Sequence, residues 1–416
     1  VKAKLSRDDI IMRGGMIVIA LYLVISLVFP LYSMFSKSFS TFQYDLSKFE
    51  VQVSDDTGQF PPTIASLESL NGELEAISND ELSTGSGGRL GVTMFFPDFS
   101  FRSPVMYRIR NVDNQGRFLV GSTLVTGTDW QELDSNTFRR VQLRPVRSTG
   151  LSNFINYFST PALFKSIQNS IFISVISTII TVILAFWFAY ALNRSCMRFK
   201  GFFRLIAMAP ILVPSLLPGI ALVYLFGAQG VIKGLLFGAS IYGPVGIIIG
   251  SVFFTFPHAF LIISTALAIS DARLYEAAIS LKATSWKTFW TVTIPGARYG
   301  IISAAFVVFN LVITDFGLPK VIGGQFNVLA VDIYKQVIGQ QNFEMGAVVS
   351  VVLIIPAILA FAIDRIVQSK QVALLTARSV PFHPKPNLRI DLAFTIYCGL
   401  VGLFIIGMLG ICQFAA

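Results

Sequence analysis

Long, predominantly apolar runs recur along this chain and restrict the folds available to it. A helix that crosses a bilayer needs about 20 such residues. Runs of this kind lie at residues 12–34, 167–193, 205–228, 244–268, 299–319, 345–364 and 392–413. Only 13% of the 416 residues are charged, whereas soluble domains carry about a quarter. We therefore predict an α-helical polytopic membrane protein with about seven transmembrane helices.

Lysine and arginine are unevenly divided between the short loops that join these runs. With the N-terminus in the cytoplasm, thirteen lie in three inner loops: Arg194, Arg198, Lys200, Arg204, Arg273, Lys282, Lys287, Arg298, Arg365, Lys370, Arg378, Lys385 and Arg389. Three lie in two short outer loops: Lys233, Lys320 and Lys335. Cytoplasmic loops carry such an excess, so we predict a cytoplasmic N-terminus. The net charge of +9 then reflects topology, and we expect no nucleic-acid partner.

The first apolar run follows a short basic segment, as it does in a signal peptide. It is too long for a typical signal-peptide core, and the sequence LYSMFSKSFS after it contains no A-x-A cleavage site. We therefore expect residues 1–37 to form a cytoplasmic tail and an uncleaved first transmembrane helix.

A polar segment, residues 38–164, separates the first run from the second. It holds ten basic and fourteen acidic residues, too many for a membrane-embedded segment. Stretches that mix β-branched and aromatic residues are typical of strands, and Asn114-Gln115-Gly116 is typical of a hairpin turn. We predict a β-rich extracytoplasmic domain here.

The sequence EAAISLKATSWKTFWTVTIP, residues 276–295, is a polar island between two apolar runs. A helix that begins near Asp271 would present four residues close to one face: Tyr275, Ala278, Leu281 and Ala283. Small side chains at Ala277 and Ala278 would let a partner's backbone approach. An aromatic face then follows, formed by Trp286, Phe289 and Trp290. Such a face suits a membrane boundary or a partner's groove, and the alternative is an ordinary interfacial connector.

This island resembles the EAA loop of ABC-importer permeases. Four residues match the motif, Glu276, Ala277, Ala278 and Pro295, whereas Lys282 stands where the family usually has a turn glycine. The resemblance implies that the loop, residues 271–298, docks into a dimer of separate ATP-binding subunits that use ATP and magnesium. The chain has no GxxxxGK[ST] phosphate loop. We therefore expect a transporter subunit that binds no cofactor itself and is not an enzyme.

Three further stretches resemble the fused, two-half permeases for ferric iron and 2-aminoethylphosphonate. They are TDFGLPKVIGG, NVLAVDIYKQVIGQQNFEMGAVVSVVLIIPAILAFAIDR and QVALLTARSVPFHPKP. The resemblance implies a MetI-like type I core at residues 165–368, a cytoplasmic linker at 369–391, and the first helix of a second half at 392–416. It also implies a bacterial inner-membrane location, a periplasmic binding protein and a second permease half, whether fused, homodimeric or heterodimeric. We expect 2-aminoethylphosphonate as cargo, with ferric iron as the alternative.

Asp315 is the principal candidate for the substrate pathway. It lies 17 residues after Arg298, roughly 25 Å along a helix. An acid at membrane depth is costly and suggests function, and the nearby Gly317 and Pro319 can break the helix. The alternative is that Asp315 caps the outer helix end or pairs with Lys320.

Asn310 and His258 are weaker candidates for the same pathway. Asn310 precedes Asp315 by five residues, and His258 is either a titrating or substrate-contacting group or a hydrogen-bonded structural one. Prolines recur at every fourth position in another apolar run: Pro210, Pro214 and Pro218. They indicate either a gating helix or a packing irregularity.

A different class of function is a membrane-anchored receptor that acts through residues 38–164. A single span would suffice for that role, so the seven predicted spans and the polar loop argue against it. The three cysteines and two histidines have no metal-binding spacing. The sequence therefore favours a permease over a receptor or an enzyme.

Overall fold

A computed structural model of the chain describes residues 7–43, 49–54, 59–60, 65–66, 92–95, 106–111, 118–120, 123–125, 129–134, 140–143, 146–236, 240–374, 382, 384 and 386–415. They fall into two compact units, Val1–Ser38 with Asn153–Ala416, and Phe39–Ser152. The expected hairpin turn at residues 114–116 and part of the expected linker lie outside the described residues.

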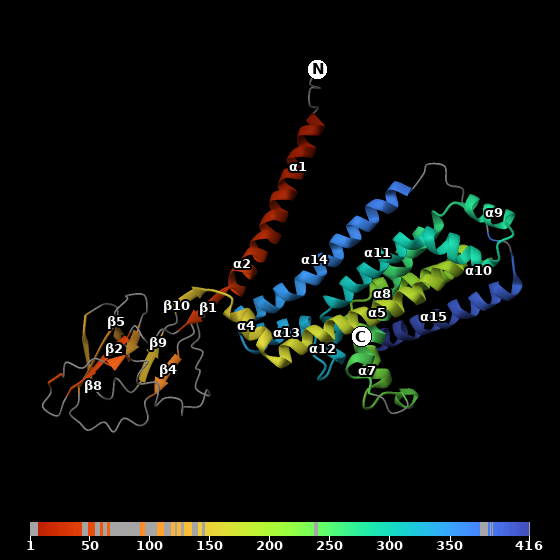
Figure 1. Cartoon of the computed structure of the whole chain (residues 1–416). Helices are drawn as coiled ribbons and strands as arrows, with labels where there is room; N and C mark the ends of the chain where they lie inside the picture. The colour runs from red at the N-terminus through yellow and green to blue at the C-terminus, as the bar shows by residue number, and fades with distance from the viewer. Residues whose placement is uncertain are drawn as a thin grey trace, which may run out of the picture. The chain divides into compact units, whose positions relative to one another are not determined.

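The first unit is helical (Figure 1). Its elements are α1 Arg7–Leu23, η1 Val24–Val28, α2 Phe29–Ser38, α4 Ser152–Ser159, α5 Pro161–Arg194, α6 Lys200–Met208, η4 Ala209–Leu212, α7 Leu216–Phe226, η5 Lys233–Leu236, α8 Pro244–Ala268, α9 Ala272–Ser280, α10 Ser285–Thr288, η6 Phe289–Thr293, α11 Ile294–Ile313, α12 Gly317–Ile322, α13 Leu329–Tyr334, η7 Lys335–Gly339, α14 Phe343–Leu374 and α15 Leu388–Ala415.

Six of these helical stretches are long and apolar enough to cross a membrane: Ile11–Ser38, Pro161–Arg194, Pro244–Ala268, Ser285–Ile313, Phe343–Ser369 and Leu388–Phe414. A seventh is bent by 103° between Lys200–Leu212 and Leu216–Phe226. The run expected to span at 205–228 is thus present as two helical arms that meet at this bend. Proline at 214 lies in the break itself and cannot donate a helical hydrogen bond, which accounts for the interruption.

Two span boundaries also differ from the expected ones. The span expected at 299–319 already ends at Ile313, and α12 begins after a break at residues 314–316. At its other end it is continuous with α10 through the π turn η6, because the backbone stays right-handed helical at Thr293 and Ile294. Pro295 lacks the N–H of one helical hydrogen bond, and it follows that π turn directly. Pro295 therefore does not separate the polar stretch from the span.

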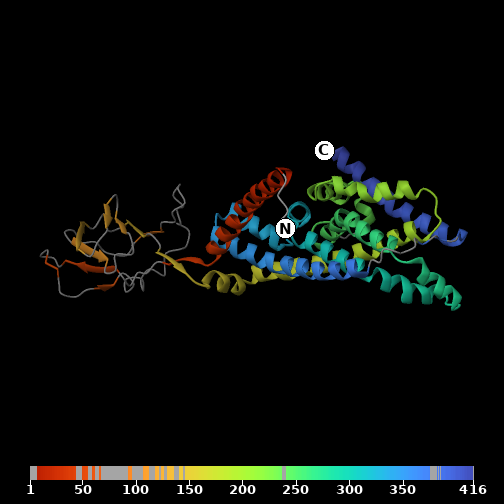
Figure 2. The same cartoon turned by 90° about the horizontal axis from the view of Figure 1, so that it is seen from above.

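The core of this unit is a helical bundle. In it α5, α8 and α11 pack on one another, and α14 packs on α11 (Figure 2). Small residues allow this close approach, as is usual where lipid replaces water as solvent. A Cβ at Gly300 of α11 would lie closer than 3.0 Å to the Cβ of Ala266 of α8. Gly300 therefore sets the distance between α8 and α11.

The short helix α12 is seated against a glycine face of α8. Leu318 and Ile322 of α12 are fully buried, and a Cβ at Gly246 or Gly250 would collide with these two side chains. The N–H of Gly243 also donates to the carbonyl of Ile322 at 2.8 Å. This packing fixes α12 directly after the break that contains Asp315.

The second unit contains strands. Their bounds are β1 Ser40–Gln43, β2 Phe49–Val53, β3 Ala65–Ser66, β4 Val92–Phe95, β5 Met106–Asn111, β6 Phe118–Val120, β7 Thr123–Val125, β8 Gln131–Asp134, β9 Arg140–Leu143 and β10 Val146–Thr149. They pair antiparallel in the orders β1-β10, β3-β2-β5-β8 and β4-β9-β6-β7. Between β2 and β5 the register places Glu50 opposite Arg110, and the two form an ion pair at 2.6 Å.

Candidate functional site

The expected helix near Asp271 is confirmed as α9. The Asp271 carboxylate accepts from the backbone N–H of Arg273 at 3.1 Å, which satisfies a donor that has no partner inside the helix. The extended backbone of Asp271 is the usual geometry of such a cap. The helix thus starts at the end of the loop from α8.

Tyr275 attaches α9 to the helical core. It is 7% exposed, and its hydroxyl donates to Oγ1 of Thr293 at 3.1 Å. Its ring centroid lies 4.6 Å from that of Phe382. The guanidinium of Arg194, at the end of α5, lies 5.0 Å from the Tyr275 ring and donates to the Leu267 carbonyl at 2.8 Å. Tyr275 thereby joins α9 to the end of α5 and to Thr293 directly before α11, and Arg194 extends the connection to the end of α8.

The two faces of α9 are sharply different. Ala272, Tyr275 and Ala278 are buried, whereas Glu276 and Ala277 are exposed. Ala278 therefore packs inside this chain, and the expectation that it lets a partner's backbone approach is wrong for that residue.

The expectation that Leu281 shares the face of Tyr275 is also wrong. Leu281 follows the last residue of α9, where the backbone leaves helical geometry, and it is 82% exposed. Together with Leu274 and Ile279, which are 55% and 60% exposed, it makes the outer surface of α9 apolar. We call Leu274, Glu276, Ala277, Ile279 and Leu281 the outer face of α9.

Lys282 occupies a left-handed turn, with φ of 53°. Its N–H donates to the carbonyl of Ile279 at 2.9 Å, and the N–H of Ala283 donates to the carbonyl of Ala278 at 3.0 Å. This pair of bonds is the Schellman pattern that ends many helices, usually with glycine at the left-handed position. The turn expected of the family's glycine is thus present, with a lysine in it.

Replacing Lys282 with glycine is expected to stabilise the loop. A non-glycine residue in the left-handed region costs roughly 1–2 kcal/mol, and Lys282→Gly removes that cost while keeping both backbone bonds. Amide exchange at Ala283 should slow by about fivefold or more. The matched control is Lys287→Gly within α10, which should speed local exchange because glycine disfavours a helix interior. Faster exchange at Ala283 in Lys282→Gly would contradict the assignment of strain.

The aromatic face expected after α9 divides between two environments. Phe289 stacks on Trp187 of α5, with ring centroids 5.5 Å apart, whereas Trp286 and Trp290 are 68% and 53% exposed. Thr284 caps α10 by accepting from the N–H of Lys287 at 3.3 Å. The partly buried Phe289 ring fixes the turn after α10 to the core, and the two exposed indoles suit the boundary of a membrane.

Asp315 lies in the break between α11 and α12. Its Oδ1 accepts from the N–H of Gly317 at 3.2 Å, so it caps α12. Burial raises the pKa of this carboxyl, and a hydrogen bond from Ser215 opposes the rise. Ser215 belongs to the break between η4 and α7, so Asp315 joins two interruptions. Among described residues it forms no ion pair with Lys320, whose ammonium lies 4.2 Å from the Tyr334 ring centroid.

Asn310 and His258 are each partly unsatisfied. The Asn310 Oδ1 and His258 Nδ1 atoms are buried, and neither has a hydrogen-bond partner in the described part of the chain. No hydrogen bond between described residues joins them to Asp315. The three candidates therefore do not form one hydrogen-bonded site in this conformation.

Asp332 is a buried acid that sequence reasoning missed. It is 4% exposed, and burial raises its pKa, opposed by a hydrogen bond from Ser166. Its Oδ2 and the Oε1 of Gln336, one turn later, lack partners among the described atoms. The available signal was the spacing of two polar residues by four within an apolar stretch, which places them on one helix face.

Metal binding by clustered side chains has no support in the described residues. They contain no group of three or more histidines, cysteines, aspartates or glutamates placed to hold an ion. Cys196 is exposed, whereas Cys398 and Cys412 are buried apart from it in α15.

The loop and the helices on both sides of it are similar to known proteins. Residues 181–372 match the model of the binding-protein-dependent transport system inner membrane component. A ferric transport system permease protein of Actinobacillus pleuropneumoniae is 27% identical over 210 residues, which cover 49% of this chain and 31% of that protein. A molybdenum transport system permease protein of Azotobacter vinelandii is 29% identical over 170 residues, 39% of this chain and 75% of that one.

Among solved structures, a bacterial alginate ABC transporter matches 56% of this chain and 85% of its own, with 17% identity and a TM-score of 0.44. The chain spans about a third of the length of the ferric transport permeases it matches. The matched segment runs from the middle of α5 to the end of α14 and includes α9, α10 and the break at Asp315. Residues 181–372 are therefore similar to the inner membrane components of binding-protein-dependent transport systems.

Proposed function

We propose that this chain is the permease subunit of an ATP-driven importer, with α9 as its docking helix for an ATP-binding subunit. The observation that carries the proposal is the outer face of α9. Three large apolar side chains there are more than half exposed, although the helix is anchored on its other side by Tyr275. An amphipathic helix with such a face suits a hydrophobic groove in a partner.

The attachment of α9 explains how docking would move the transmembrane helices. Tyr275 contacts Arg194 at the end of α5 and Thr293 at the start of α11. A displacement of α9 by closing ATP-binding subunits would therefore act on two packed helices at once. Packed helices transmit such displacements as rigid elements. ATP and magnesium would be used by the partner, and this chain would supply the substrate pathway.

The proposed topology follows from basic residues in short loops. Residues 1–37 would form a cytoplasmic tail and anchor, 38–164 a β-rich extracytoplasmic domain, and 165–368 the permease core. Residues 369–391 would be a cytoplasmic linker, and 392–416 the first helix of a second half. A bacterial inner membrane, a periplasmic binding protein and a second permease half complete the proposed assembly.

For the cargo, 2-aminoethylphosphonate is the first candidate. The partly buried carboxyl of Asp315 is a counter-charge for an ammonium group, and this is the chemical feature that supports a zwitterion. Ferric iron is the second candidate, favoured by the similarity to the ferric transport permease. Affinity of the cognate binding protein for each of the two ligands would decide between them.

The docking role is tested by Glu276→Arg. Glu276 is exposed on the outer face of α9, so its replacement should leave folding intact and reduce co-purification of a co-expressed ATP-binding subunit by tenfold or more. Such a loss corresponds to about 1.4 kcal/mol. The matched control is Glu344→Arg at the start of α14. It makes the same change of charge at a position away from α9.

Two results would count against the proposal. An undiminished complex in Glu276→Arg would remove α9 as the docking element. Failure of the unaltered chain to bind any ATP-binding subunit would favour the alternative of a membrane-anchored receptor that acts through residues 38–164.

A further inference from the structure

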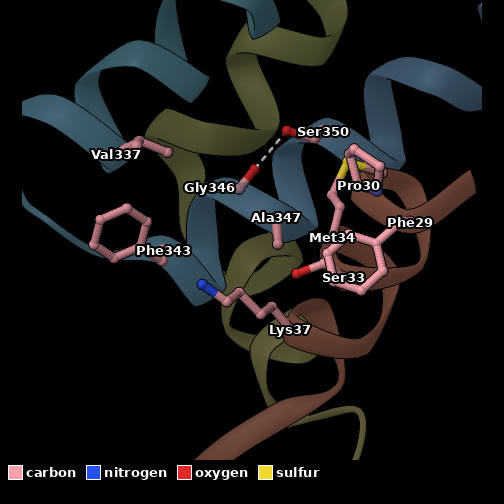
Figure 3. Close-up of a pocket in the computed structure, with 10 residues that line it drawn as sticks. All are labelled: Phe29, Pro30, Ser33, Met34, Lys37, Val337, Phe343, Gly346, Ala347 and Ser350. Atoms are coloured by element: carbon pink, nitrogen blue, oxygen red, sulfur yellow. Dashed lines mark hydrogen bonds between the residues drawn. The ribbon is translucent and has the colours of Figure 1, made fainter. Parts of the chain in front are cut away.

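A cavity of about 410 Å³ lies between α2 and α14 (Figure 3). Its walls are mostly apolar, with Phe29, Met34 and Ala347 among them. The pocket opens to the surface, where apolar walls are hydrated unfavourably, and its volume falls in the range of sites for small organic ligands, ~300–1,000 Å³. The lining therefore favours an apolar occupant.

The helices on both sides of the cavity belong to candidate membrane spans. In the span Ile11–Ser38, none of the most apolar residues is buried inside the protein. In a bilayer these side chains must face lipid or another apolar surface. Acyl chains are thus the most abundant apolar groups that can enter the space beside α2.

Lys37 gives this cavity a charged end. It lies in the last turn of α2, its ammonium is 5.1 Å from the Phe343 ring centroid, and it forms no ion pair among the described residues. The nearby acid Glu344 is not part of the lining. Figure 3 shows the Ser33 hydroxyl and the Lys37 ammonium directed to the same side of α2. A cation beside an apolar cavity at the end of a span matches a lipid phosphate.

We propose that the cavity between α2 and α14 binds one anionic phospholipid. Its acyl chain lies against Phe29, Met34 and Ala347, and its phosphate contacts the ammonium of Lys37 and the hydroxyl of Ser33. A phospholipid accounts for both properties of the site, because the apolar walls continue into the bilayer and the single cation lies at the end of the span. This inference requires only that the two helices cross a membrane, and it is independent of the docking role of α9.

The test uses the full chain in lipid nanodiscs with photoreactive acyl-chain probes. Phosphatidylglycerol and phosphatidylcholine probes are compared, and labelled peptides are mapped by mass spectrometry. We expect phosphatidylglycerol to label peptides containing residues 29–37 and 343–350 about fivefold more than phosphatidylcholine, since one lysine near anionic lipid contributes about 1 kcal/mol. Lys37→Gln should reduce the label to the phosphatidylcholine level, whereas Lys165→Gln, an exposed lysine of α5, should not.

A second variant tests the acyl-chain part of the site. Ser33→Phe fills the cavity and should reduce labelling of these peptides by both probes, with labelling of the exposed residues of α15 unchanged. Equal labelling by the two probes, or insensitivity to Lys37→Gln, would overturn the anionic-lipid proposal. Protection of both peptides from every lipid probe in the unaltered chain would also overturn it, because a protein surface would then cover the cavity.

Discussion

Gly300→Ala is expected to lower the apparent melting temperature of the detergent-solubilised protein by several degrees. The added methyl group would lie closer than 3.0 Å to the Cβ of Ala266. A Cβ is fixed to its backbone, so relief requires separation of α8 from α11. Overpacking of this kind costs about 1–3 kcal/mol. The cost falls on the contact between two helices of the helical core.

Gly296 provides a control in the same helix. A Cβ at Gly296 would meet its nearest neighbour, Ser270, at 3.8 Å, an ordinary contact. Gly296→Ala should therefore leave the melting temperature unchanged or raise it slightly, because alanine favours a helix over glycine. Adding Ala266→Gly to Gly300→Ala removes the colliding methyl and should restore most of the loss. Equal behaviour of Gly296→Ala and Gly300→Ala would refute this account of the crossing.

Local chemistry made parts of the site predictable from sequence. Asp271 was recognisable as a helix start because a carboxylate can accept from free backbone donors. The break after Ile313 was indicated by Gly317 and Pro319. The polar loop was recognisable because charged residues interrupt two long apolar runs. Each of these signals depends on residues close together in the chain.

Features that depend on distant residues were not predictable. Ala278 is buried only because the core lies beneath α9, and apolar periodicity on a short helix does not say which face meets the protein. Leu281 lies outside the buried face because the backbone turns at Lys282. The angle of 103° within Lys200–Phe226 cannot be read from hydropathy, since both arms are apolar, although Pro214 marks the position of the break. For Asp332 the sequence offered only the spacing to Gln336 four residues later, and its burial depends on packing between helices.

The attachment of α9 identifies a further residue of the loop whose mutation tests coupling between α9 and the core. Matching of the motif draws attention to Glu276, Ala277 and Ala278, but in this chain the energetic link to the core is Tyr275. Glu276 is exposed and available to a partner. Loss of Glu276 and loss of Tyr275 should therefore weaken coupling for different physical reasons, which can be separated by measurement.

Tyr275→Ala is expected to release α9 from the core. The change deletes the hydroxyl that donates to Thr293, and the ring that packs on Phe382 and Arg194. Truncation of a buried aromatic side chain costs about 3–5 kcal/mol. Amide protection of α9 should fall on the order of 100-fold, measured by hydrogen exchange of the detergent-solubilised chain. Tyr275→Phe keeps the ring and loses one hydrogen bond, so it should cost about 1 kcal/mol.

A variant on the outer face of α9 distinguishes the attachment of α9 to the core from its docking to an ATP-binding subunit. Leu274→Ala changes the neighbouring residue, which is 55% exposed, and should leave the exchange of α9 unchanged while weakening association with an ATP-binding subunit. Tyr275→Ala should reduce ATP-driven uptake in reconstituted vesicles even where the subunit still binds, because docking on a detached helix no longer displaces α5 and α11. Unchanged amide protection of α9 in Tyr275→Ala would mean that other contacts hold the helix. Normal uptake in this variant would mean that Tyr275 does not couple α9 to the transmembrane helices.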